Sequence, residues 1–143
     1  MKRKIAMVVM GLIFLGTFPA NYFAHRLRYT RHARTPEGFA EIIGVELRPG
    51  TEIRDYKLYD PPADGPNSFW LLHDEGGLRY LAEDRAGRPC GWFRSFGDAW
   101  PELPEPVRSF EIIEEFGIGD PKMDNFLYLS TDERIAIVYD FRP

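Results

Sequence analysis

The chain has few of the residues that build metal centres, disulfide frameworks and nucleophilic active sites. Its 143 residues include one cysteine, Cys90, and three histidines. A single cysteine excludes an intramolecular disulfide, and one cysteine with three histidines supplies too few soft ligands for a typical structural zinc site. We therefore predict a domain without a metal centre and without a cofactor.

Common catalytic signatures are missing as well. The sequence contains no Gly-x-Ser-x-Gly, no Gly-x-x-x-x-Gly-Lys and no Gly-x-Gly-x-x-Gly pattern. In other proteins these patterns mark a nucleophilic serine, a phosphate-binding loop and a dinucleotide site. Catalytic groups can be distant in sequence, so an enzyme of unusual type stays an alternative. The absence favours a noncatalytic protein.

Acidic residues are absent from the first 35 positions, which carry a formal charge of +7. All 22 Asp and Glu and the other eleven Lys and Arg follow, so residues 36–143 have a formal charge of −11. A domain of that sign repels nucleic-acid phosphates, and we expect no nucleic-acid partner. The basic residues of the first segment are Lys2, Arg3, Lys4, Arg26, Arg28, Arg31 and Arg34.

What the chain does have is a hydrophobic composition and an uncharged run. Hydrophobic residues make up 44% of the chain, which is enough to build the core of one ordinary domain. Residues 5–24 carry no charge, and a helix of that length would extend about 30 Å, the thickness of a bilayer's hydrocarbon core. We predict a membrane anchor with a basic stalk at residues 1–35 and an acidic globular domain at residues 36–143.

A cleavable secretory signal is the alternative for the uncharged run, because a basic start precedes an apolar stretch of signal length. Small residues are needed one and three positions before a cleavage site. Ala20 is preceded by Phe18 two positions earlier, and Ala24 by Tyr22. Neither makes a good site, which favours an uncleaved, single-pass anchor.

Charges near the run do not determine orientation, since three basic residues precede it and four arginines follow it. A very short amino-terminal tail commonly stays in the cytoplasm while a larger carboxyl-terminal part is exported. We therefore expect a cell-membrane protein with its domain on the extracytoplasmic side. A cleaved signal would instead give a secreted or periplasmic domain.

Secondary-structure patterns predict an α+β domain with about five or six mostly antiparallel strands and one main packed helix. Thr35, Pro36 and Glu37 resemble a helix start, and Gly44 is a natural stop. The main packed helix is expected over residues 75–86, where Leu78, Leu81 and Ala82 recur at helical spacing. Strands are expected at residues 53–59, 68–73, 91–96, 110–116, 125–130 and 134–141. A helix over residues 107–116 is the alternative for the fourth of these strands.

His73 is the first candidate site residue, because it alone among the histidines adjoins two carboxylates, Asp74 and Glu75. Such a group at the end of a strand could act as a general base or hold a metal ion. Consecutive strand residues point to opposite faces, however, and Asp74 is a good helix cap. A pocket around His73 is therefore the enzymatic or ligand-binding alternative.

Trp100 is the second candidate, since a tryptophan stiffened by Pro101 and Pro104 in a loop can anchor a protein contact. The same side chain could instead fold back and cover the core, and we favour this interpretation because no pattern in the sequence repeats the feature. Cys90 has no adjacent catalytic partner and is expected to be a buried thiol. The late acids could bind calcium but lack the spacing of a calcium loop, which favours turns; they are Asp120, Asp124, Asp132 and Glu133.

These observations identify no reaction. The leading hypothesis is a membrane-anchored, noncatalytic domain that binds a protein or an envelope component, with the bilayer contacted through residues 5–24. An enzyme or ligand pocket around His73 is one alternative. An acidic inhibitor or immunity-type protein that neutralises a basic partner is the other.

Overall fold

The computed structural model describes residues 20–59, 67–82, 85–90, 94–105 and 107–141. The chain divides into two compact units, residues 1–32 and residues 33–143. Helix continues through residues 20–33. No helix among the described residues is long and apolar enough to cross a bilayer. The predicted span at residues 5–24 lies outside the described residues except for its last five positions.

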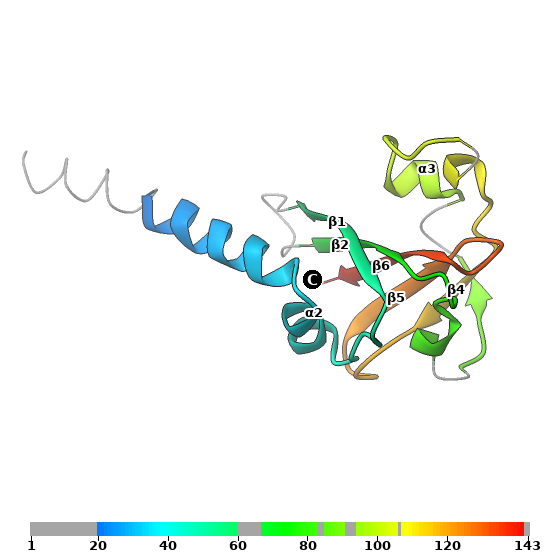
Figure 1. Ribbon diagram of the computed structural model, residues 1–143, viewed down its shortest axis with the longest axis horizontal. Helices are drawn as coiled ribbons and strands as arrows, with labels where there is room; N and C mark the ends of the chain where they lie inside the picture. The colour runs from blue at the N-terminus through cyan, green and yellow to red at the C-terminus, as the bar shows by residue number, and fades with distance from the viewer. Residues whose placement is uncertain (1–19, 60–66, 83–84, 91–93, 106, 142–143) are drawn as a thin grey trace, which may run out of the picture. The chain divides into compact units, whose positions relative to one another are not determined.

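The second unit is built on a six-stranded antiparallel sheet, so the α+β class is confirmed (Figure 1). The strand order is β1-β2-β6-β5-β4-β3, and every neighbouring pair is antiparallel. The last strand of the sequence therefore lies near the centre of the sheet. The strands are β1 Glu52–Tyr59, β2 Asn67–His73, β3 Arg88–Pro89, β4 Glu114–Gly117, β5 Asp124–Leu129 and β6 Ile135–Phe141.

Helix α2, Pro36–Ile43, forms where the capping residues predict it. The Thr35 hydroxyl accepts a hydrogen bond from the Gly38 N–H at 3.0 Å, and Gly44 ends the helix with a φ of 80°. Phe39 packs edge-on against Trp70 of β2, with ring centroids 5.6 Å apart. Helix α2 thus covers the face of the sheet to which Trp70 points.

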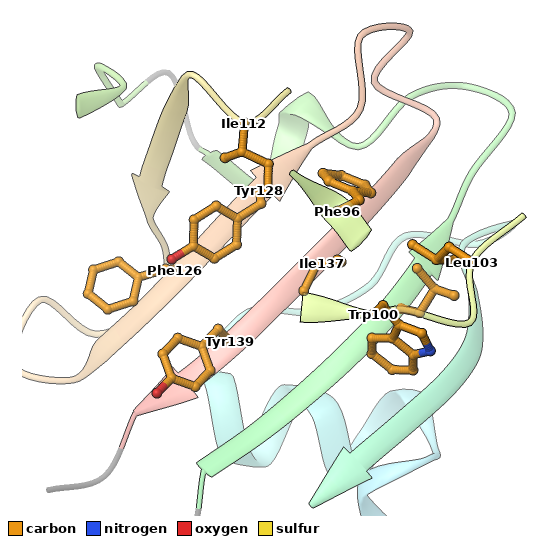
Figure 2. Packing of buried hydrophobic residues seen from close by; sticks show 9 residues of the cluster. Phe96, Trp100, Leu103, Ile112, Phe126, Tyr128, Ile137 and Tyr139 are labelled. Carbon is orange, nitrogen blue, oxygen red and sulfur yellow. The ribbon is translucent and has the colours of Figure 1, made fainter. Parts of the chain in front are cut away.

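The opposite face is covered by α3, Phe96–Ala99, and the loop that follows it. Leu71 follows Trp70 in β2 and therefore points to the other face, where it belongs to the same buried cluster as Phe96 and Trp100. Figure 2 shows this cluster lying against β6 and β5. The sheet is consequently the middle of three layers, and residues 136–140 of β6 are buried throughout. The last strand is therefore buried on both of its faces.

The predicted helix over residues 75–86 is wrong for the described part of that range. A short 3-10 helix, η1 Arg79–Ala82, stands in its place. Gly77 adopts a φ of 85°, which a helix cannot continue through, and the Asp74 carboxylate binds Arg48 as well as the Gly76 N–H. Leu78 and Leu81 are nevertheless fully buried. Their spacing predicted their burial correctly but did not predict the length of the helix. Among the described residues, α2 is the longest helix packed on the sheet.

Two further expectations need correction between β3 and β5. Residues 94–96 are the described end of the strand expected at 91–96, and they do not form a strand. The Asp98 carboxylate accepts hydrogen bonds from the Arg94 and Ser95 N–H groups, and helix α3 begins at Phe96. Within 110–116 the strand starts only at Glu114. The alternative helix over 107–116 is reduced to a 3-10 turn, η2 Val107–Ser109.

Candidate functional site

His73 lies at the end of β2 between two glutamates, and its side chain is 14% exposed. The imidazole Nδ1 lies 3.8 Å from Glu52 Oε2, and Nε2 lies 3.4 Å from Glu75 Oε1. Glu75 also pairs with Arg134 at 3.1 Å. Both glutamates are exposed, so solvent screens their charges. The arrangement forms an ion pair when His73 is protonated.

Asp74, the neighbour of His73, is buried in a denser network. Its carboxylate accepts hydrogen bonds from Arg48 Nε at 2.9 Å, Arg48 Nη2 at 3.1 Å and the Thr51 hydroxyl at 2.6 Å. The Gly76 N–H donates a fourth at 2.7 Å. The Arg48 guanidinium also stacks over the Tyr80 ring, 4.6 Å from its centroid. This network joins the start of β1 to the corner that follows β2.

The charge of Asp74 is therefore fixed by the fold. Hydrogen bonding from Arg48 holds the pKa of the Asp74 carboxyl well below its ordinary value, with smaller contributions from Thr51 and the Gly76 N–H. A carboxylate that has its acceptor capacity occupied and its proton lost is a poor proton shuttle. Asp74 stabilises the corner, and His73 does not gain a catalytic partner from it.

The Trp100 side chain points into the protein and is 3% exposed. It packs in the cluster drawn in Figure 2, and Lys57 Nζ lies 4.5 Å from the centroid of its ring. Lys57 also forms an ion pair with Glu102 at 2.6 Å. A protein contact through Trp100 would require this loop to open.

Cys90 is half-buried and packs against the same cluster. Nearby, the Tyr128 hydroxyl donates to the buried Glu115 carboxylate at 3.1 Å, and Arg88 Nε pairs with the other carboxylate oxygen at 2.7 Å. Burial, followed by the charge of Glu115, raises the pKa of Tyr128 far above its ordinary value. Tyr128 therefore keeps its proton as a donor, and the group holds a buried charge in place rather than activating a nucleophile.

Three of the four late acidic residues take part in turns or ion pairs. Asp120 accepts from the Lys122 N–H at 2.9 Å, and Asp132 accepts from the Ser130 hydroxyl at 2.7 Å. Glu133 pairs with Arg79 at 2.5 Å. Across the described ranges, no group of three or more His, Cys, Asp or Glu side chains is arranged to hold a metal ion.

The sequence did not single out one surface feature, which we call the Ile113 groove. It is a hollow of about 230 Å³ between the segment leading into β4 and the end of β5. Ile113, Phe116 and Leu129 form its apolar part, and Glu111 and Glu114 are exposed at its border. The signal available in the sequence was the pair of consecutive isoleucines, because consecutive extended residues point to opposite faces. Ile112 is buried, and Ile113 is 73% exposed.

Arg79 shows how a cation sits at one end of this groove. Its guanidinium lies over the Phe116 ring, 4.8 Å from the centroid, and pairs with Glu133. The hydrogen bonds that Arg79 donates to the Glu133 carboxylate raise the pKa of Arg79, and the charge of Glu114 adds to the effect. The groove therefore combines an apolar wall with carboxylates that already stabilise one arginine.

Comparison with known protein families, curated proteins and solved structures finds no match for this chain.

Proposed function

We propose that the protein is a membrane-tethered, noncatalytic domain that binds another protein through its acidic surface. The observation that carries the proposal is the separation of charge along the chain, +7 in residues 1–35 and −11 in residues 36–143. A basic segment beside an apolar run suits anionic headgroups, whereas the acidic domain suits a basic partner.

The described end of the first unit supports the tether. Tyr22, Phe23 and Leu27 are large hydrophobic side chains that the helix at residues 20–33 leaves exposed. The same helix carries Arg26, Arg28 and Arg31 after the two aromatic residues. Aromatic rings and arginines together are typical of the interface between a bilayer and water, so this helix fits the position immediately after a membrane anchor.

The domain supports binding through charge rather than through its proline-rich loop. Trp100 is buried, so it offers no exposed anchor. Carboxylates such as Glu46, Glu111 and Glu114 are exposed. A basic partner would meet an attractive field as it approaches, which raises the association rate and makes binding sensitive to salt. The acidic-inhibitor alternative uses this same surface and differs only in what happens to the partner.

The test is purification of the full chain, tagged at its carboxyl terminus, from membranes in a mild detergent. We expect one basic protein to be recovered in stoichiometric amount and to be released as the salt concentration rises. Recovery of no stoichiometric partner at low salt would contradict the proposal, and so would a partner that salt does not release.

A further inference from the structure

The Ile113 groove lies where the described pairing of β4 with β5 ends. Phe116 and Gly117 pair with β5, opposite Leu127 and Phe126. Glu114 and Glu115 pair instead with Pro89 and Arg88 of β3. The described β4–β5 pairs therefore end at Phe116 and Leu127, whereas β5 continues to Leu129.

The backbone of β5 faces the groove at this point. Ser130 N–H donates to the Ile135 carbonyl at 2.8 Å, so Ser130 bonds toward β6. Hydrogen-bonding direction alternates along an antiparallel strand, and the N–H and C=O of Leu129 accordingly point to the β4 side. Leu129 lies beyond the last described pair of the β4–β5 ladder. The Leu129 backbone groups can therefore pair with an extended segment that enters the groove.

Side chains on the other wall of the groove are held outward by their neighbours. The Ile112 N–H donates to the Arg94 carbonyl at 2.9 Å, and its side chain is buried in the cluster. Because extended residues alternate, Ile113 is turned to solvent. The hollow of about 230 Å³ is smaller than the roughly 300–1,000 Å³ of most small-molecule sites, so it suits one guest side chain better than a cofactor.

The charges select the guest. Glu133 is directly paired with Arg79, whereas Glu114 acts on Arg79 only through its charge, and the side chains of Glu111 and Glu114 are exposed. A lysine or arginine could lay its aliphatic stem on Ile113 and Leu129 and direct its charge to these two carboxylates. An acidic or nucleic-acid segment would be repelled.

We propose that the Ile113 groove binds an extended segment of a partner protein, in which a basic side chain lies between apolar, β-branched residues. The segment pairs with the edge of β5 at Leu129 and places its basic side chain between Ile113 and the carboxylates of Glu111 and Glu114. The inference rests on the proposed function, because it specifies which part of the acidic surface the partner contacts.

The probe is the capped peptide Thr-Val-Arg-Val-Thr, titrated into the isotopically labelled full chain in zwitterionic micelles and followed by amide chemical shifts. We expect shifts centred on the Leu129 and Ser130 amides, and an affinity that falls between about 50 and about 500 mM salt. The same peptide with Glu in place of Arg should not bind. Replacing both valines by proline, which cannot donate to a strand edge, should weaken binding about tenfold.

Variants of the chain locate the site. Glu111→Gln with Glu114→Gln, and separately Ile113→Ser, should each weaken binding about tenfold, since all three side chains are exposed and their replacement leaves the core intact. Glu37→Gln with Glu46→Gln removes the same charge from exposed positions outside the groove and should leave the affinity within about twofold.

Equal weakening in both double variants would overturn the groove as the site, and would leave binding by the acidic surface as a whole in place. No binding of the arginine peptide to the unaltered chain would also overturn it. Neither result bears on recovery of a partner from membranes, so failure of this inference and failure of the proposed function are separable.

Discussion

The Asp74 carboxylate contributes to the stability of the fold because both of its oxygens accept hydrogen bonds. It accepts hydrogen bonds from Arg48, Thr51 and the Gly76 N–H in a corner that also fixes the position of His73. From sequence, Asp74 was expected to cap a helix. The residue is structural as expected, but its partner Arg48 lies 26 positions away, and no local pattern could reveal that contact.

Replacing this carboxylate gives a prediction with a defined pH dependence. Asp74→Asn should lower the free energy of unfolding by about 1–3 kcal/mol at neutral pH, because one buried charge-assisted pair is lost. The folded-state pKa of Asp74 is depressed, so its stabilisation is complete above the ordinary carboxyl pKa of about 4 and is lost as the pH falls below it. Urea unfolding of both full chains in mild detergent should show that the difference in their unfolding free energies narrows as the pH falls toward about 2–3. A difference that stays constant with pH would contradict the assignment.

Trp100 provides a second prediction at this scale. Because the side chain is buried in the cluster, Trp100→Ala should cost about 3–5 kcal/mol of unfolding free energy. The control is Ile113→Ala, which truncates a side chain that is exposed and should change stability by less than about 0.5 kcal/mol. Equal, small effects on thermal unfolding would mean that Trp100 lies on the surface in solution.

Elements differ in how far local sequence determines them. Helix α2 was predicted because capping by Thr35 and termination by Gly44 are local properties. Strand β1 was predicted from a mixed, alternating pattern, whereas strands β2, β5 and β6 were predicted from denser hydrophobic or β-rich runs. The 75–86 helix failed because Gly76, Gly77 and the distant Arg48 govern the chain there, and the Ile113 groove was missed because it depends on where β4 leaves β5.

The packing of α2 depends on a close approach between Gly119 and the end of the helix, which the sequence alone does not predict. A Cβ on Gly119, whose φ is +67°, would lie 1.9 Å from the Ile43 carbonyl oxygen at the end of α2. The backbone of the β4–β5 loop therefore lies directly against that helix end. Asn125 Nδ2 donates to the same carbonyl at 3.5 Å.

We expect Gly119→Ala to destabilise the domain more than Gly50→Ala. At Gly50 the φ is +100° but a Cβ meets nothing within 4 Å, so the cost should be limited to backbone strain of about 1–2 kcal/mol. Gly119→Ala adds a clash that only movement of α2 or the loop relieves. Urea unfolding that ranks the two variants equally would show that the helix end and the loop are not in contact.

In the whole molecule, the proposed function rests on the division of charge between the first 35 residues and the rest. The arginine-bearing helix at residues 20–33 exposes Tyr22 and Phe23, whereas the acidic domain builds its own three-layer core. The distribution of charge along the sequence predicted this division, and secondary-structure patterns predicted the α+β class. Partner identity depends on surface geometry, which composition does not contain.

The most direct test is protease accessibility of the full chain, tagged at its carboxyl terminus, in intact right-side-out cells, with the membrane fraction analysed on the same blot. We expect a full-length band that stays in the membrane after alkaline carbonate extraction and whose domain is digested from outside. A shortened band in the soluble fraction would contradict the tether, and a domain digested only after lysis would contradict its extracytoplasmic placement.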